Sequence, residues 1–246
     1  MRGVSVPPEL FDEDYLYFYA DVLGDDRSDA DARVVARLLS LQPGMRVLDI
    51  PCGEGRIAGR LARLGCEVVG LDASERLLAL AGARYPEVRF ERRDMRELAY
   101  RSEFDAVVNW FTSFGYFDSA TNDALLASLA RALRRGGRLL LDIHNPARLA
   151  RILELTGGST ASVAERDGNL MVDRITYNAA DQRSRTERFI VRHGRVRRLE
   201  FSLEQVPAQQ LERRLVAAGF REVQLFGRDG GSFDPNGARL IAVARR

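Results

Sequence analysis

The chain contains no lysine: all 37 of its basic residues are arginine, and they nearly balance 35 acidic residues. The formal net charge is therefore only +2. Because the arginines accompany abundant alanine, glycine and leucine, they are typical of GC-rich codon usage. This argues against treating each arginine cluster as a nucleic-acid site.

Cysteine and histidine are also scarce. The chain has two cysteines, Cys52 and Cys66, and two histidines, His144 and His193. Two cysteines in 246 residues make neither a disulfide framework nor a zinc site. Since the histidines have no metal-like spacing, we expect no metal ion.

Long hydrophobic runs are missing as well. No apolar stretch approaches the roughly 20 residues of a membrane span, and residues 1–15 lack the apolar middle of a signal peptide. We therefore expect a cytoplasmic protein without membrane contact. The length and the 46% hydrophobic content predict one domain, with room for an insertion.

The stretch from Met45 to Asp72 reads MRVLDIPCGEGRIAGRLARLGCEVVGLD. A short apolar run ends at Ile50 and predicts a buried strand. The glycine-rich turn CGEG follows, and apolar residues at helical spacing then predict a helix that stops at Gly65. A second apolar run ends at Asp72. Strand, glycine turn, helix, strand and acid, in that order, predict a nucleotide-binding βαβ unit.

Two classes of ligand fit this unit. The glycines satisfy the loose dinucleotide fingerprint Gly53-x-Gly55-x-x-Ala58, and Asp72 stands near the distance expected for a carboxylate that binds ribose. Asp49 favours the other class. A carboxylate directly before the glycines would repel a pyrophosphate, but it would attract an ammonium or sulfonium group. An oxidoreductase that uses NAD or NADP is the alternative.

LDIPCGEG followed by VVGLD resembles motifs one and two of the class I S-adenosylmethionine-dependent methyltransferases of small molecules. The resemblance implies an α/β fold with a doubly wound, mostly parallel seven-stranded sheet. The expected parts are an N-terminal helical cap (1–44), a Rossmann-like cofactor domain (45–155 and 205–246) and an antiparallel β-meander inserted after the fifth strand (156–204).

The resemblance also implies S-adenosylmethionine as the cofactor. Its amino acid end would lie against the first glycine turn, its ribose at the end of the second strand, and its adenine at the RDM segment after the third strand. The cofactor-binding residues that the resemblance implies are Asp49, Gly53, Gly55, Asp72, Ala73, Asp94, Met95 and Asn109.

Aromatic residues gather in two places that could form an acceptor pocket. The segment from Glu9 to Val22 predicts an amphipathic helix, and its Tyr15 and Tyr19 are candidates to reach the cofactor or the acceptor. A second aromatic stretch follows the fourth strand, at the edge where open α/β sheets bind ligands. It supplies three candidate substrate-binding residues, namely Phe114, Tyr116 and Phe117.

The segment from 161 to 204 has β-type alternation and two hairpin signals, Asp167-Gly168 and His193-Gly194. It predicts a four-stranded antiparallel meander, with His193 as a turn residue. We expect this insertion to lie over the acceptor site or to join two subunits in a homodimer. Its nine arginines between Arg166 and Arg198 keep an RNA methyltransferase open as a further alternative.

Together these features predict methyl transfer from S-adenosylmethionine to a nitrogen, or an oxygen, of a small-molecule acceptor, catalysed mainly by positioning. His144 ends the fifth strand and is the candidate for substrate contact or for proton removal from a hydroxyl acceptor. The candidate catalytic residues are therefore His144, Tyr15 and Tyr19.

Overall fold

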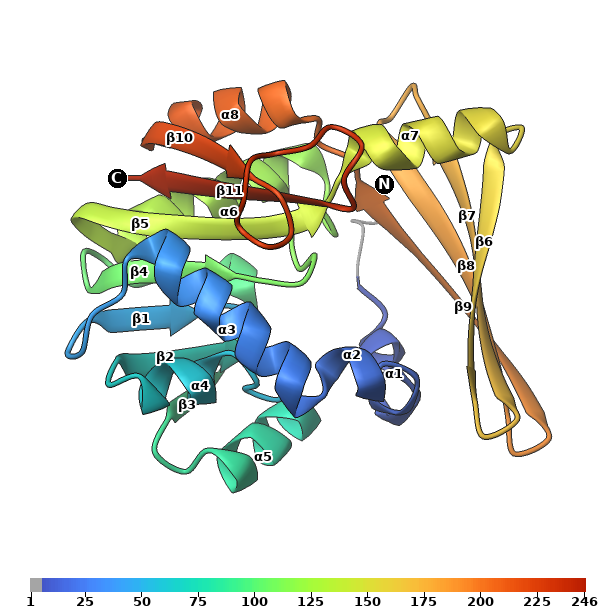
Figure 1. The fold of residues 1–246 in the computed structure, drawn as a ribbon, viewed down its shortest axis with the longest axis horizontal. Helices are drawn as coiled ribbons and strands as arrows, with labels where there is room; N and C mark the ends of the chain where they lie inside the picture. The colour runs from blue at the N-terminus through green and yellow to red at the C-terminus, as the bar shows by residue number, and fades with distance from the viewer. Residues whose placement is uncertain (1–5) are drawn as a thin grey trace.

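A computed structural model describes residues 6–246. The first five residues of the expected N-terminal cap lie outside this range. The described chain forms a seven-stranded sheet covered by helices on both faces, and a separate four-stranded sheet that stands beside one of its edges (Figure 1).

The large sheet has the strand order β10-β11-β5-β4-β1-β2-β3. The first five strands along the chain pair in parallel, and β11 is antiparallel to both of its neighbours, β5 and β10. The expected mostly parallel, seven-stranded α/β sheet is therefore confirmed. Its strands are β1 (Arg46–Asp49), β2 (Glu67–Asp72), β3 (Arg89–Arg92), β4 (Phe104–Asn109), β5 (Leu133–His144), β10 (Arg221–Phe226) and β11 (Arg239–Arg245).

Helices cover both faces of this sheet because its central strands are apolar on both sides. On one face, the buried side chains of α3 and α4 pack against Val47, Val108 and Leu140. On the other face, α6 and α8 pack against Leu48, Val107 and Leu141. The helices are α3 (Asp25–Leu39), α4 (Ala58–Arg63), α5 (Glu75–Arg84), α6 (Ser119–Ala132) and α8 (Ala208–Ala217), and a 3-10 turn, η2 (Met95–Glu97), follows β3.

Four expected site residues are the last residues of parallel strands. Asp49 ends β1, Asp72 ends β2, Asn109 ends β4 and His144 ends β5. Since the carboxyl ends of parallel strands meet at one edge of a sheet, the fold brings these four residues to the same edge.

The N-terminal segment differs from the single helix that the sequence predicts. It consists of a 3-10 turn η1 (Pro8–Phe11) and two short helices, α1 (Glu13–Phe18) and α2 (Ala20–Leu23). Asp12 interrupts it with an extended backbone, and its carboxylate accepts a hydrogen bond from the amide of Asp14 at 2.9 Å. A continuous helix is therefore wrong here, because the Asp12 side chain begins a new helix.

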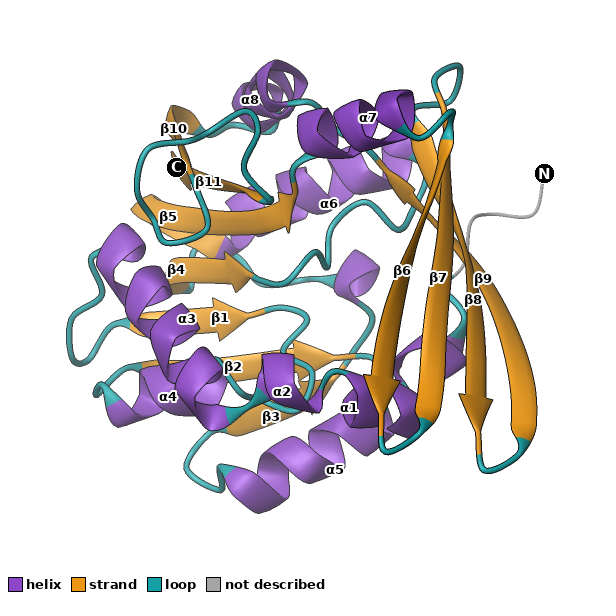
Figure 2. Cartoon of the chain, turned by 45° about the vertical axis from the view of Figure 1, so that its right-hand side comes forward, coloured by secondary structure: helices purple, strands orange, loops and turns teal. Residues whose placement is uncertain are grey.

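The insertion is the antiparallel four-stranded meander that the sequence predicts. Helix α7 (Pro146–Leu155) leads into β6 (Ser159–Arg166), β7 (Asn169–Asn178), β8 (Arg183–Arg192) and β9 (Arg195–Glu204). Both predicted hairpin turns have two successive residues with positive φ, and His193 (φ 53°) is one of them. Figure 2 shows the meander standing across the carboxyl edge of the large sheet, next to α1 and α2. Within residues 6–246 no helix is long and apolar enough to cross a membrane.

Candidate functional site

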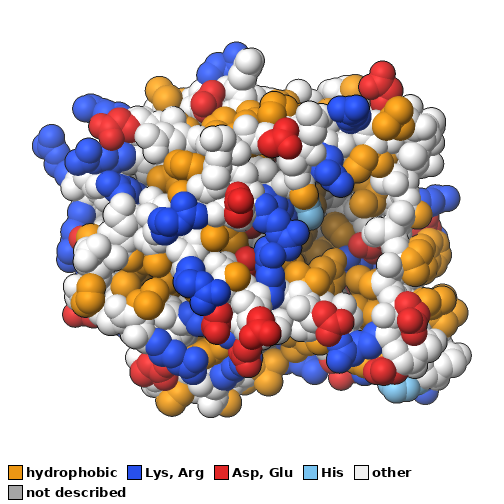
Figure 3. All heavy atoms as spheres, in the orientation of Figure 1, with side chains coloured by type: hydrophobic (Ala, Val, Ile, Leu, Met, Phe, Trp, Pro, Cys, Tyr) orange, Lys and Arg blue, Asp and Glu red, His pale blue; other side chains and the backbone are white. Residues whose placement is uncertain are grey.

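A cavity of about 1010 Å³ opens at the carboxyl edge of the large sheet. Four parts of the chain line it: the strand ends and their loops, the N-terminal segment, helix α7 and the inner face of the meander. Figure 3 shows a recess with hydrophobic side chains between the main body and the meander. We call the part beside β1, β2 and β3 the strand-edge half, and the part beneath the meander the insertion half.

The glycine turn shapes the strand-edge half. Gly53 lines the cavity with φ at +56°, and no atom lies within 4 Å of the position a Cβ would take. Its amide donates a hydrogen bond to Asp72 at 2.8 Å, while the amide of Ser74 donates to the other Asp72 oxygen at 2.8 Å. The Asp72 carboxylate is thus fixed at the cavity wall, where it is able to accept further hydrogen bonds from ligand hydroxyls. Ala73 lies beside it in the same wall.

Asp49 lies under the glycine turn and also lines the cavity. Only 2% of the residue is exposed, and its carboxylate accepts a hydrogen bond from the amide of Ala58 at 3.1 Å. Burial raises the pKa of Asp49 to about 7, although the nearby positive charge of Arg56 opposes the shift. Burial also raises the pKa values of Asp72 and Glu54 in the same wall. This half of the cavity therefore favours a ligand that brings positive charge.

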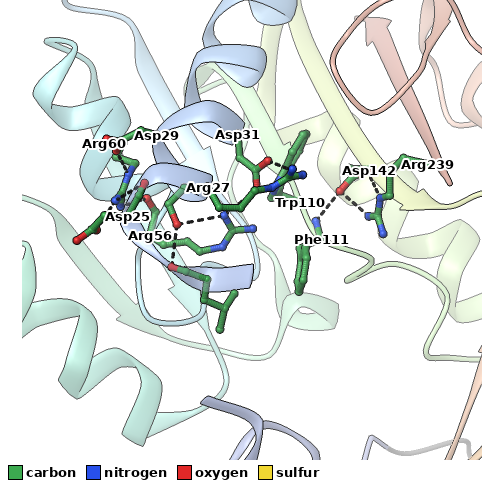
Figure 4. Close-up of polar contacts among 12 residues, drawn as sticks. Asp25, Arg27, Asp29, Asp31, Arg56, Arg60, Trp110, Phe111, Asp142 and Arg239 are labelled. Carbon is green, nitrogen blue, oxygen red and sulfur yellow. Dashed lines mark hydrogen bonds and ion pairs between the residues drawn. The ribbon is translucent and has the colours of Figure 1, made fainter. Parts of the chain in front are cut away.

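Arg56 is a cavity residue that the sequence analysis did not identify. One of its terminal nitrogens donates to Asp31 at 2.9 Å, and the indole of Trp110 donates to the same carboxylate at 3.2 Å (Figure 4). The other terminal nitrogen, Nη2, is buried and has no hydrogen-bond partner among residues 6–246. A carboxylate at this place would satisfy it. The only sequence signal was its position, directly after the glycine turn.

These residues fit the amino acid and ribose parts of S-adenosylmethionine. Asp49 offers a carboxylate for an ammonium group, Arg56 a guanidinium nitrogen without a partner for a carboxylate, and Asp72 a fixed acceptor for ribose hydroxyls. A dinucleotide would instead place a doubly charged pyrophosphate beside Asp49. The charges in this half therefore fit the sulfonium cofactor better.

Asp94 and Met95 line the cavity after β3, as the resemblance implies. Arg96 pairs with both oxygens of Asp94, at 3.0 and 2.6 Å. This pairing lowers the pKa of the Asp94 carboxyl, so the group is ionised at neutral pH. Asp94 is held at the cavity wall, and both of its oxygens accept hydrogen bonds from Arg96. The sequence analysis did not predict this partner.

Three expected residues do not line the cavity. Gly55 lies behind the turn, where a Cβ would come within 2.9 Å of Phe90, so its lack of a side chain serves packing. Asn109 is fully buried and donates to the carbonyl of Ile50 at 2.7 Å. Phe114 is 2% exposed in the core with α6 and α8. The cavity geometry therefore supports none of these three as a ligand contact.

Aromatic side chains form a continuous wall along the cavity. Tyr15 lies 4.9 Å from Tyr19 and 5.4 Å from Phe11 between ring centroids, and Phe11 lies 5.9 Å from Tyr116. Tyr19 also contacts Phe111 edge to face at 6.2 Å. All five line the cavity, so the structure brings together the tyrosines of two distant segments. Phe117 lines it as well.

Burial controls the chemistry of two of these tyrosines. It raises the pKa of Tyr15 and the pKa of Tyr116 far above the ordinary value of a phenol. Both phenols therefore keep their protons at neutral pH. They are able to donate hydrogen bonds, but neither one is a ready proton acceptor.

The meander contributes polar groups to the insertion half. Arg188 forms a buried, bidentate ion pair with Asp173, at 2.7 and 2.8 Å, and also donates to the hydroxyl of Tyr19 at 3.2 Å. The hydroxyls of Ser184 and Thr186 line the same wall. This contact between β8 and the N-terminal segment could not be found in the sequence, because it joins residues 169 positions apart.

His144 lines the cavity beside Arg239, the first residue of β11. The two residues are paired in register, and Nη1 of Arg239 lies 3.2 Å from Nδ1 of His144. His144 is an exposed residue at the end of its strand, but the protein atoms packed around its ring and the positive charge of Arg239 lower its pKa from 6.5 to about 4. The expectation that this ring accepts a proton near neutral pH is therefore not supported.

Among residues 6–246, no group of three or more histidine, cysteine, aspartate or glutamate side chains is placed to hold a metal ion.

Comparisons with known proteins find relatives among the methyltransferases. Residues 47–137 match a family described as a methyltransferase domain. The chain is 32% identical over 177 residues to a cypemycin N-terminal methyltransferase from a Streptomyces species, and the match covers 70% of each chain. It is 30% identical over 137 residues, 55% of each chain, to a Streptomyces venezuelae dTDP-3-amino-3,4,6-trideoxy-alpha-D-glucopyranose N,N-dimethyltransferase.

The crystal structure of Streptomyces venezuelae DesVI superposes with a TM-score of 0.68 at 26% identity, covering 95% of this chain and 98% of that one. Three further curated methyltransferases are 30–37% identical, but the chain spans only 48–61% of their own length. The sheet order and these matches show that the chain belongs to the class I S-adenosylmethionine-dependent methyltransferases.

Proposed function

We propose that this protein transfers a methyl group from S-adenosylmethionine to an amine nitrogen of a small molecule. We choose nitrogen rather than oxygen as the methylated atom because, among the described residues, the insertion half contains no ready proton acceptor. Tyr15 and Tyr116 stay protonated, and Nδ1 of His144 is engaged by Arg239. A hydroxyl acceptor needs a base during transfer, whereas an amine needs only to be in its neutral form.

When bound, S-adenosylmethionine supplies a methyl group already activated on a sulfonium sulfur. The strand-edge half would hold it, with Asp49 and Arg56 at its amino acid end and Asp72 at its ribose. In-line alignment of nucleophile and methyl carbon accounts for up to roughly 7–11 kcal/mol of the barrier. The aromatic wall excludes water and orients the amine, so the protein acts mainly through position.

The names of two relatives support a nitrogen acceptor. The cypemycin enzyme is an N-terminal methyltransferase, and the second acts on the nitrogen of an amino sugar nucleotide. An amine that bears polar groups also suits the insertion half, which combines the aromatic wall with the hydroxyls of Ser184 and Thr186 and the Asp173–Arg188 pair.

The RNA alternative is weakened by how the meander uses its arginines. Eight of the nine already contact carboxylates or carbonyl oxygens of this chain: Arg166, Arg174, Arg183, Arg185, Arg188, Arg192, Arg197 and Arg198. Arginines neutralised in this way supply little of the phosphate attraction on which RNA binding depends.

The test is a methyl-transfer assay with paired acceptors. The protein is incubated with isotope-labelled S-adenosylmethionine and with amines and their matched alcohols, including an amino sugar nucleotide and a peptide with a free N-terminus. We expect labelled product from amines only. Labelled product from the alcohols alone would overturn the proposal.

A further inference from the structure

The proposed function leaves His144 without the role of a base, yet the residue lines the cavity. Its surroundings decide what it can do there. Asp142, on the same strand, accepts hydrogen bonds from Nε of Arg239 at 2.8 Å and from Nη2 at 2.5 Å (Figure 4). This bidentate pair, with Asp142 only 2% exposed, fixes the plane of the guanidinium. The remaining nitrogen, Nη1, is the one that faces Nδ1 of His144.

The contact has only one consistent pattern of protons. A guanidinium group carries donors alone and does not lose its proton in proteins. Nδ1 of His144 must therefore be the acceptor, and it carries no hydrogen. A neutral imidazole has one N–H, so that hydrogen lies on Nε2.

We propose that Arg239 fixes His144 as the Nε2–H tautomer, so that His144 donates a hydrogen bond to an oxygen of the methyl acceptor. This inference rests on the proposed function, and it narrows the substrate class to amines that carry a hydroxyl or carbonyl oxygen near the reacting nitrogen. An alkylamine without such an oxygen leaves the Nε2–H unpaired. Arg239 is a positioning residue in this arrangement, and His144 determines specificity.

The charges around His144 agree with this role. The negative charge of Asp142 is already balanced by the bidentate guanidinium of Arg239, so it gives an imidazolium little stabilisation. On α7, Arg148 lines the same wall and donates to the carbonyl of Asn236 at 3.1 Å, and across the cavity the Asp173–Arg188 pair neutralises itself. Desolvation of the ring and the positive charge of Arg239 lower the pKa of His144, and these neighbouring groups leave that shift unopposed.

The tautomer can be measured directly because the chain has only two histidines. The variant His193→Asn removes the other one at an exposed turn, where asparagine tolerates the positive φ. Nitrogen-15 NMR of this variant, bound to S-adenosylhomocysteine, then reports His144 alone. We expect a neutral ring with the proton on Nε2 from pH 5.5 to pH 8.5. A proton on Nδ1, or a titration near pH 6.5, would overturn the proposal.

A second variant tests whether Arg239 is the cause. In the His193→Asn background, Asp142→Asn with Arg239→Met removes both members of the buried pair, so no single charge is stranded. Asparagine keeps an oxygen that accepts the hydrogen bond from the amide of Phe111. We expect mixed tautomers and a titration that moves upward into the range of pH 5.5–8.5. The same tautomer and the same absence of titration as in the parent would contradict the role of Arg239.

The substrate arm compares 2-aminocyclohexanol with cyclohexylamine as methyl acceptors. One hydrogen bond predicts a preference of about 3- to 10-fold in kcat/KM for the amino alcohol. The preference should disappear in His144→Ala and persist in part in His144→Gln, whose amide still donates. Equal kcat/KM values for the methylation of the two amines would overturn the assignment of an oxygen-bearing amine.

The two proposals fail separately. The NMR measurement needs no turnover, so the Nε2–H tautomer without any methylated amine would sink the proposed function alone. The Nδ1–H tautomer in an enzyme that methylates amines would sink this inference alone.

Discussion

At the residue scale, Asp49 illustrates how one carboxylate serves both the fold and the ligand. It accepts a hydrogen bond at the start of α4, and it lines the cavity where a ligand ammonium group would lie. Burial opposes its ionisation, so its pKa is raised to about 7. The ligand-free protein therefore holds this group close to its titration midpoint at physiological pH.

This raised pKa predicts a pH-dependent affinity for the cofactor. Below pH 7 Asp49 is protonated and attracts no ammonium group, and above pH 7 it is ionised. The affinity for S-adenosylhomocysteine should therefore rise about five- to tenfold from pH 6 to pH 7.5. Calorimetric titrations at several pH values measure this rise.

Asp49→Asn should bind S-adenosylhomocysteine more weakly, and its affinity should change less with pH. The remaining change in affinity with pH would come from Glu54 and Asp72. Equal slopes in the two proteins would show that Asp49 does not control binding.

Sequence reasoning succeeded where a residue's place depends on its neighbours in the chain. Asp49 and Asp72 each follow an apolar run, so their position at strand ends could be predicted. Phe114 could not be placed in this way. Phe111 and Thr112 both have positive φ, held by hydrogen bonds to Asp142, and the chain after them turns Phe114 into the core. That turn depends on a carboxylate 31 residues away, which no local pattern reveals.

At the element scale, the N-terminal segment is held against the meander by ion pairs. Asp14 pairs with Arg192 and with Arg197, each at 2.7 Å, and Asp12 pairs with Arg197 at 2.5 Å. The hydroxyl of Tyr17 adds a hydrogen bond to the carbonyl of Arg166 at 2.9 Å. These contacts hold the segment that carries Tyr15 and Tyr19 over the cavity.

Breaking this contact should speed the escape of ligand. Asp14→Asn removes two partly buried ion pairs, worth about 1 kcal/mol in docking energy, and should raise the dissociation rate of S-adenosylhomocysteine three- to tenfold. Trp110 is the chain's single tryptophan and lines the cavity, so its fluorescence follows release in a displacement experiment.

The matched control is Asp21→Asn. Asp21 also faces an arginine of the meander, Arg166, but its side chain is 96% exposed and the pair spans 3.3 Å. A solvated pair contributes little, so this rate should stay near that of the parent protein. If both variants accelerate release equally, or neither does, the ion pairs of Asp14 do not hold the segment closed.

Sequence periodicity predicted most elements correctly but not their contacts. Both hairpins of the meander were predicted because their turns need residues that tolerate positive φ. The break at Asp12 was missed, since an aspartate inside an amphipathic pattern is also compatible with a continuous helix. The ion pairs between the N-terminal segment and the meander depend on tertiary packing and have no local signal.

At the scale of the whole molecule, the cavity exists because the N-terminal segment, helix α7 and the meander meet at the carboxyl edge of the large sheet. The family resemblance predicted the sheet, which is confirmed, and the cavity opens at the edge where ligand binding was expected. The register that places Arg239 opposite His144 arises only when β11 inserts between β5 and β10. The cofactor side of the site was therefore largely predictable, whereas the insertion half was not.

The most direct test of the account is a calorimetric titration of the full chain with S-adenosylhomocysteine and, separately, with NAD. We predict that the parent protein and the exposed-surface control Glu87→Gln bind S-adenosylhomocysteine equally well and do not bind NAD. Asp72→Asn should bind it more than about tenfold more weakly, because a charge-assisted contact to the ribose is lost. Binding of NAD alone, or an unchanged affinity in Asp72→Asn, would contradict the assignment of this cavity.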